Sequence, residues 1–107
     1  MTIRTTTAPT GAHVSYYRCP IPNPCRPTTA PYVAECDDLI IGLRLTFQEA
    51  NVFKAIWRSA AARLGDGKPG HSALYDAEKI VHYGRLIEQM VRSELGLEPQ
   101  LEEGKAP

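Results

Sequence analysis

The sequence lacks any run of 18 or more apolar residues, and its first 30 residues lack the apolar segment of a secretion signal. We therefore predict no membrane-spanning helix and expect a cytoplasmic protein. A strong charge of one sign is also missing, since 12 lysines and arginines balance 12 aspartates and glutamates. Proteins that bind duplex nucleic acid usually carry a basic patch, so duplex nucleic acid is not a predicted partner.

Cysteine is scarce, and the three that occur are an odd number, which fits a reducing compartment better than a set of disulfides. His13, Cys19, Cys25 and Cys36 are the only grouping with the chemistry of zinc ligands. None of these cysteines forms a C-x₂₋₄-C pair, and three of the four ligands lie in a proline-rich stretch. We predict free thiols and no metal site.

Two nucleotide-binding motifs are absent. The loop of residues 65–71 places Lys68 among glycines, but it does not match G-x-x-x-x-G-K-[ST], and Pro69 follows the lysine. All-helical nucleoside triphosphate pyrophosphatases hold Mg²⁺ with clustered carboxylates from two helices, in an E-E-x-x-E run that this chain lacks. Glu35 and Asp38 supply only half of that pattern, so this function ranks last among the alternatives.

The two ends of the chain are predicted to lie outside the folded body. Residues 1–30 form a proline- and threonine-rich arm, disordered or extended, because proline removes backbone donors and does not suit a helix or a central strand. Tyr16 and Tyr17 are candidates to pack onto the body and hold part of this arm. Residues 97–107 are predicted to be a disordered polar tail.

The middle of the chain, residues 31–96, predicts an all-α fold, a small three-helix bundle. The first helix is expected over 33–44, with Glu35 and Asp38 near its positive end. The second is expected over 46–64: Thr46 and Glu49 form a capping-box pattern, and Gly65 ends the helix. The third is expected from the Ser72 cap to Leu95, with Gly96 stopping it.

Apolar residues recur at helical spacing in the second and third helices, and we expect these stripes to face the core. The members are Phe53, Ile56, Trp57, Ala60 and Leu64 in one helix, and Ala73, Ala77, Ile80, Gly84, Ile87, Val91 and Leu95 in the other. A folded body of about 65 residues has a small core and therefore marginal stability alone, which predicts a homo-oligomer.

Each of these helices also carries a polar triplet beside its apolar stripe: Asn51, Lys54 and Arg58 in the second, and Asp76, Lys79 and Tyr83 in the third. If the helices pack antiparallel, the triplets meet along one groove. The cations suit a phosphate, the asparagine and tyrosine suit a base or sugar, and Asp76 suits a lysine or Mg²⁺. The structural alternative is an ion pair from Arg58 to Asp76 that fixes the register of the helices.

Two runs, NVFKAIWR from Asn51 to Arg58 and DAEKIVHYGRLIE from Asp76 to Glu88, resemble the SaV-like family of small phage and prophage proteins. They also resemble the C-terminal part of a lytic coliphage nucleoside monophosphate kinase. The family pattern is roughly an acidic helix, then N-x-x-K-Y-x-x-R, then D-L-x-K-A-x-W-Y-L. The matching positions are Glu35, Asp38, Asn51, Lys54, Arg58, Asp76, Lys79 and Tyr83.

The chain departs from this family at three places. The family opens with K-P-x-H-Y, of which Pro31-Tyr32 remains, and Ala55 and His82 stand where it has aromatic residues. The resemblance implies a phage-derived protein in a bacterial host, and any enzyme activity is expected to resemble that of the kinase.

The leading hypothesis is a phosphate or nucleotide ligand, with or without Mg²⁺, held in the groove between the second and third helices. The alternative is a non-enzymatic helical module that binds a host protein or signalling molecule. The proline-rich arm and the marginal core favour this alternative.

Overall fold

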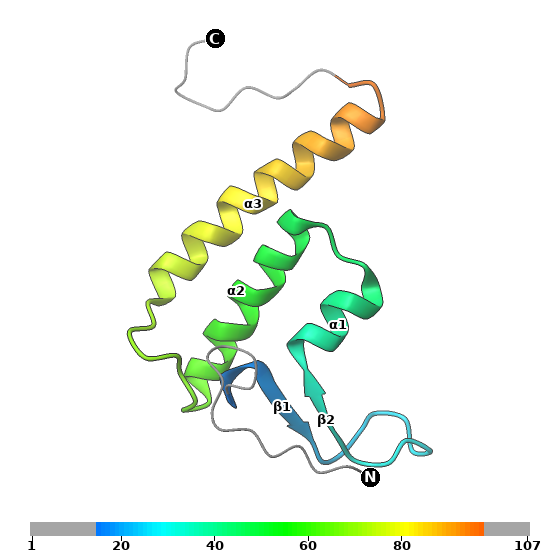
Figure 1. The fold of residues 1–107 in the computed structure, drawn as a ribbon, viewed down its shortest axis with the longest axis vertical. Helices are drawn as coiled ribbons and strands as arrows, with labels where there is room; N and C mark the ends of the chain where they lie inside the picture. Colours follow the sequence, from blue (N-terminus) through cyan, green and yellow to red (C-terminus); the bar gives the residue numbers. More distant parts are fainter. Residues whose placement is uncertain (1–14, 98–107) are drawn as a thin grey trace.

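The computed structural model describes residues 15–97 and is built mainly of helices (Figure 1). A short 3₁₀ turn, η1 (Ser15–Tyr17), leads into strand β1 (Arg18–Ile21), and strand β2 (Tyr32–Glu35) follows a proline-rich loop. Three helices then complete the described part of the chain: α1 (Cys36–Leu43), α2 (Phe47–Arg63) and α3 (Ala73–Glu94). The three predicted helices are confirmed, but the prediction of a purely α-helical bundle is wrong because a β-hairpin precedes them.

The hairpin pairs β1 with β2 antiparallel, with Arg18 opposite Glu35 and Ile21 opposite Tyr32. Pro20 lies within β1, which is compatible with pairing because both strands of a two-stranded sheet are edge strands. Part of the predicted arm is therefore extended but paired, and residues 1–14 lie outside the described part of the chain. Because β2 takes up residues 32–35, α1 begins at Cys36 rather than at Val33.

The ends of α2 follow the local sequence signals. The Thr46 side chain accepts a hydrogen bond from the Glu49 amide at 3.2 Å, and the Glu49 carboxylate accepts one from the Thr46 amide at 2.9 Å. Gly65 adopts a φ of 91°, and the Asp66 amide donates to the Ala61 carbonyl, which closes the helix in a Schellman motif.

The ends of α3 repeat this agreement. The Ser72 hydroxyl caps the helix by accepting from the Tyr75 amide at 3.1 Å. At the other end Gly96 has a φ of 72°, as expected of a stop signal. The predicted boundaries of both long helices are thus confirmed to within a residue or two.

Helices α2 and α3 form an antiparallel pair, and α3 continues past the beginning of α2 (Figure 1). The Phe47 and Tyr83 rings meet edge to face at 5.8 Å at one end of this seam. Arg58 and Asp76 meet at the other end. The hairpin and α1 pack against α2 away from α3, so α2 is the central element.

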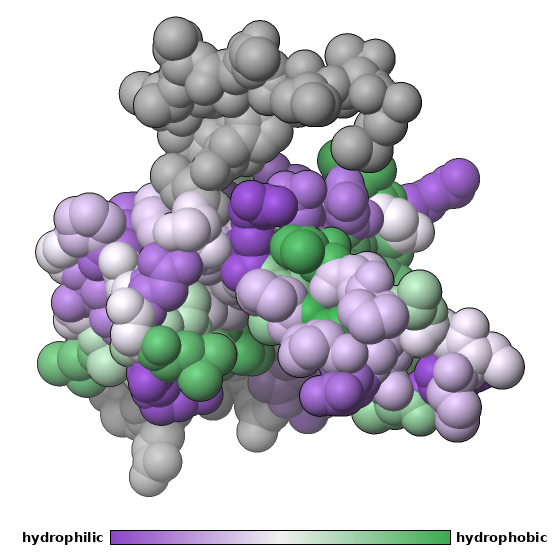
Figure 2. Space-filling view, turned by 90° about the horizontal axis from the view of Figure 1, so that it is seen from below, coloured by the Kyte–Doolittle hydropathy of each residue, from purple (hydrophilic) through white to green (hydrophobic). Residues whose placement is uncertain are grey.

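The apolar stripes predicted to form the core are only partly buried. In the described part of the chain the only fully buried apolar side chains are Cys36 and Ala55. Ile56 and Leu64 of α2 are 52% and 81% exposed, and Val91 and Leu95 of α3 are also exposed. Seen from below, the surface shows hydrophobic residues in patches among hydrophilic ones (Figure 2). The middle of each stripe is half-buried, at Phe53, Trp57 and Ala60 in α2 and at Ile80, Gly84 and Ile87 in α3, so the predicted faces are only partly covered.

Candidate functional site

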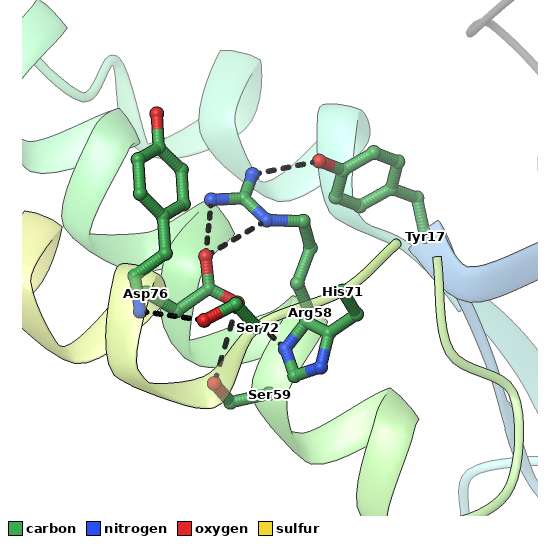
Figure 3. Close-up of polar contacts among 7 residues, drawn as sticks. Tyr17, Arg58, Ser59, His71, Ser72 and Asp76 are labelled. Carbon is green, nitrogen blue, oxygen red and sulfur yellow. Dashed lines mark hydrogen bonds and ion pairs between the residues drawn. The ribbon is translucent and has the colours of Figure 1, made fainter. Parts of the chain in front are cut away.

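The most buried polar feature of the described chain is an ion pair between α2 and α3 (Figure 3). The Arg58 guanidinium donates to Asp76 Oδ1 from Nη2 at 2.8 Å and from Nε at 3.2 Å. Arg58 is 8% exposed and Asp76 is 1% exposed. The pair lies across the helix seam, as the structural alternative for these residues predicted.

Three further side chains complete this polar cluster (Figure 3). Arg58 Nη1 donates to the Tyr17 hydroxyl at 2.9 Å, which ties η1 to α2. On the other side, Asp76 Oδ2 lies 2.8 Å from His71 Nε2 and accepts from the Ser59 hydroxyl at 3.4 Å. A carboxylate can only accept, so His71 Nε2 carries the hydrogen. The polar cluster thus links η1, α2, α3 and the loop between the two helices.

The electrostatics keep both members of the ion pair charged. Burial alone would raise the pKa of Asp76, but the hydrogen bonds and charge of Arg58, with a smaller contribution from His71, bring that pKa below its usual value. Burial would likewise lower the pKa of Arg58, but its hydrogen bonds to Asp76 and Tyr17 raise it. The positive and negative charges therefore balance inside the cluster.

The other predicted site residues lie along the same seam, each with a different neighbour. Asn51 Nδ2 donates to the Phe47 carbonyl of its own helix at 2.8 Å. Lys54 Nζ lies 5.3 Å from the centroid of the Tyr17 ring, and Lys79 Nζ lies 5.3 Å from that of Tyr75. Tyr83 packs on the Phe47 ring. The structure therefore brings Arg58 and Asp76 into direct contact, whereas Asn51 and Tyr83 contact Phe47 at the other end of the seam and each lysine lies over a tyrosine ring.

Lys54 and Lys79 leave their helices at the same level and on the same side of the seam. The Phe47–Tyr83 and Arg58–Asp76 contacts set the register, which places Lys54 opposite residues 78 and 79. At about 100° per residue, Lys54 is rotated by about −40° from Arg58 and Lys79 by about −60° from Asp76. In antiparallel helices, rotations of the same sign lead to the same side, so the two lysine stems flank one stretch of the seam.

Cys36, at the start of α1, is a buried side chain that the sequence did not single out as part of the site. Its thiol is fully buried, and burial, reinforced by the Asp37 carboxylate, raises its pKa from 9.0 to about 11. The charges of Lys54 and Arg58 act in the opposite direction, but the effect of burial is larger. Cys36 is therefore a packed, neutral side chain rather than a nucleophile.

Sequence reasoning missed the parts of the polar cluster that are distant along the chain. Tyr17 was predicted to pack on the body, but not to bond to Arg58, 41 positions away. His71 and Ser59 had no predicted partner. One available signal was the lone histidine just before the Ser72 cap, since a loop residue next to a helix start can reach a first-turn carboxylate such as Asp76.

The four residues considered as zinc ligands and set aside in the sequence analysis are not all described by the structure. His13 lies outside the described residues, and Cys19, Cys25 and Cys36 are free thiols. Within residues 15–97, no three histidine, cysteine or acidic side chains are arranged to hold a metal ion. Glu35 lies at the start of α1, and its nearest cation is Arg18 at 3.9 Å.

Comparison of the chain with protein-family models, with curated protein sequences and with solved structures finds no match. The resemblance to the SaV-like family therefore stays a prediction from the two quoted runs. Within residues 15–97, no helix is both long and apolar enough to cross a membrane.

Proposed function

We propose that this chain binds a small phosphate-bearing ligand, a nucleotide in the first instance, beside the α2–α3 seam between Lys54 and Lys79. The observation that carries the proposal is the arrangement of these two cations. Within residues 15–97 neither has a carboxylate oxygen within 4.0 Å, whereas the charge of Arg58 is balanced by Asp76. Two uncompensated ammonium groups flanking one stretch of a seam favour an anion there.

The ion pair has a positioning role in this proposal. Both oxygens of Asp76 and all three nitrogens of the Arg58 guanidinium are already hydrogen-bonded. Arg58 is thus a poor phosphate ligand, and Asp76 offers no free oxygen to Mg²⁺. Instead, the pair fixes the register that sets Lys54 opposite Lys79. Any Mg²⁺ would be held through the phosphates of the ligand rather than by this carboxylate.

The neighbours of the two lysines suit the remainder of a nucleotide. The rings of Tyr17 and Tyr75 lie next to the ammonium groups and offer faces on which a base can stack. Asn51 and Tyr83 lie one helical turn further along the seam, where an amide and a hydroxyl can bond a sugar or base edge. The resemblance of these two runs to a nucleoside monophosphate kinase also favours a nucleotide.

The test is a calorimetric titration of the full chain with deoxynucleoside monophosphates, triphosphates and inorganic phosphate, with and without Mg²⁺. Lys54→Gln and Lys79→Gln are each expected to weaken binding about tenfold, because each removes a charged hydrogen-bond donor. Lys68→Gln, in the exposed loop before α3, is the matched control and should bind as the wild type does. Absence of binding at millimolar ligand, or equal binding by the double lysine variant, overturns the proposal.

A second candidate, from a different class, is a non-enzymatic assembly module. The exposed apolar residues of α2 favour it, because a helix face with Ile56 and Leu64 open to solvent is more typical of an interface than of a free surface. The two candidates use different faces of α2. Variants at Lys54 and Lys79 therefore test the ligand without disturbing an interface, and variants at Ile56 do the reverse.

A further inference from the structure

A cavity between α2 and α3 opens on the side of the seam opposite Lys54 and Lys79. It encloses about 550 Å³, within the range of about 300–1,000 Å³ that is usual for small-molecule sites. Ser59 and Arg63 of α2 line it. At about 100° per residue they are rotated by about +100° and +140° from Arg58, opposite in sense to Lys54. This cavity is therefore separate from the site proposed for the nucleotide.

The wall of this cavity carries one uncompensated positive charge. Arg63 is an exposed residue in the last turn of α2, and within residues 15–97 no carboxylate oxygen lies within 4.0 Å of its guanidinium. Among the described residues that line the cavity, His71 is the only other ionisable one, and Asp76 behind it is already paired with Arg58. A guanidinium binds a carboxylate through two parallel hydrogen bonds, so Arg63 suits a monoanion that carries this group.

His71 offers a hydrogen-bond acceptor to the same cavity. Its Nε2 donates to Asp76, so in the neutral ring the other nitrogen, Nδ1, is an acceptor. Figure 3 shows that nitrogen turned away from Asp76, and among residues 15–97 it has no hydrogen-bond partner. Within the same residues no buried side-chain nitrogen lacks a partner, so Nδ1 is open to solvent.

Ser59 brings this acceptor and the guanidinium close together. The Ser59 hydroxyl and His71 Nε2 bond to the same oxygen of Asp76, at 3.4 Å and 2.8 Å, so their side chains are neighbours in the cavity wall. Arg63 lies one helical turn from Ser59 on the same helix, and residues at this spacing are also neighbours. A ligand that meets both groups therefore needs a hydrogen-bond donor close to its carboxylate.

The other walls of the cavity are apolar. They include Ile56 and Ala62 from α2, and Ala77 and Ile80 from α3. A short aliphatic group that covers these side chains leaves water, which favours binding.

We propose that this cavity binds a small 2-hydroxy carboxylate with an aliphatic side chain. The carboxylate binds Arg63, the hydroxyl group donates to His71 Nδ1, and the aliphatic group packs on the apolar walls. An amino acid is a poorer match, because its ammonium group would bring a second positive charge next to Arg63. A plain aliphatic acid lacks the donor that Nδ1 requires.

The experiment is a calorimetric titration of the full chain with 2-hydroxy-4-methylpentanoate at about pH 8, where imidazole in solution is neutral. Saturable binding is expected at millimolar ligand. The analogue 4-methylpentanoate lacks the hydroxyl group and should bind about fivefold more weakly, because one hydrogen bond is lost. Arg63→Gln should bind the hydroxy acid about tenfold more weakly. Arg26→Gln is the matched control, since Arg26 is an exposed arginine outside the cavity, and its affinity should be unchanged.

Two further measurements locate the ligand. Lys54→Gln should bind the hydroxy acid as the wild type does, because Lys54 lies across the seam. The nitrogen magnetic resonance of His71 Nδ1, assigned with a His71→Gln variant, should shift with the hydroxy acid and less with 4-methylpentanoate. Absence of binding at millimolar ligand overturns the proposal. So do equal binding of the two acids, an unaffected Arg63→Gln variant, a weakened Arg26→Gln or Lys54→Gln variant, and an unshifted Nδ1 resonance.

Discussion

The two faces of α2 differ in the kind of side chain that each of them buries. The face toward α3 carries Arg58, which is almost fully buried with Asp76. The opposite face carries Ile56 and Leu64, which are mostly in solvent. Single exposed apolar residues are normal, but these two line one continuous groove with Phe53 and Trp57. The side of α2 toward α3 thus buries a hydrogen-bonded ion pair together with the small side chain of Ala55, whereas the apolar side is only half-buried at Phe53 and Trp57.

The polar face can be buried because its groups satisfy one another. Taking an arginine and an aspartate out of water is costly, and their attraction offsets that cost only when further hydrogen bonds complete the geometry. Here Tyr17, Ser59 and His71 supply those bonds. Within the described residues, no buried side-chain nitrogen or oxygen lacks a partner. The directional bonds of a planar guanidinium also specify one register, which an apolar seam would define less sharply.

The largest expected effect comes from breaking the ion pair on one side. Asp76→Ala leaves the Arg58 guanidinium buried without a counter-charge, which should lower the free energy of unfolding by about 3–5 kcal/mol. Urea denaturation followed by circular dichroism measures this difference. The effect should be large even though alanine is a better helix former than aspartate.

Two controls show whether burial of charge is the cause. Ile41→Ala removes more apolar surface from a side chain that is exposed on α1, and should change the same free energy by no more than about 0.5 kcal/mol. The double variant Arg58→Met, Asp76→Leu replaces the pair by apolar side chains and should recover much of the loss. If Asp76→Ala and Ile41→Ala lower the free energy of unfolding equally, the buried ion pair contributes no more to stability than an exposed apolar side chain, and the contrast drawn above is wrong.

A smaller effect is expected from acid. The pKa of Asp76 is lower in the folded chain than its ordinary value of 3.8, so the unfolded chain takes up the proton first as the pH falls. The stabilisation is therefore complete above about pH 4 and is lost as the pH falls through the lower folded-state value, by at most about 1.4 kcal/mol per pH unit. Urea titrations at descending pH should show this slope, and Asp76→Asn should flatten it. An equal slope in that variant would assign the acid sensitivity to other carboxylates.

The parts of the fold that were predicted correctly are those set by local sequence. The capping box at Thr46, the Ser72 cap and the stops at Gly65 and Gly96 act within a single helical turn, so the sequence displays all the groups involved. The antiparallel packing of α2 and α3, which the sequence analysis took only as a condition for the groove, is present in the structure. The predicted and observed helix ends agree because the capping interactions involve residues that are close together in the sequence.

The parts that were missed depend on partners far along the chain. In the pairing of β1 with β2, Arg18 lies opposite Glu35, on the other side of a proline-rich loop. A four-residue edge strand that contains a proline has no hydrophobic periodicity by which it could be predicted. Hydrophobic periodicity identified two stripes on α2 correctly. It did not show which stripe faces α3, because periodicity considers each side chain by itself. It contains no information on the hydrogen bonds that Arg58 and Asp76 make with each other.

For the candidate site, the structure bears out part of what the two triplets indicated. Arg58 meets Asp76 across the helix interface, and Tyr83 packs on Phe47 of α2. Asn51 and Lys79 contact their own helices, and Lys54 contacts Tyr17. Which of these residues are hydrogen-bonded and which keep a free charge depends on the tertiary structure. Arg58 and Asp76 form an ion pair inside the polar cluster. Lys54 and Lys79 lie over tyrosine rings, and within residues 15–97 neither forms an ion pair.

The smallest expected effect on stability distinguishes the edge of the seam from its buried centre. Among residues 15–97, the Asn51 side chain bonds only to the Phe47 carbonyl of its own helix, an interaction that competes weakly with helix geometry. In Asn51→Ala, the lost hydrogen bond and the gain in helix propensity nearly cancel, so the free energy of unfolding should change by no more than about 0.5 kcal/mol. If nucleotide affinity falls in this variant while urea denaturation is unchanged, the asparagine serves the ligand. A loss of stability comparable to that of Asp76→Ala would instead place Asn51 in the polar cluster and extend the buried network along the whole seam.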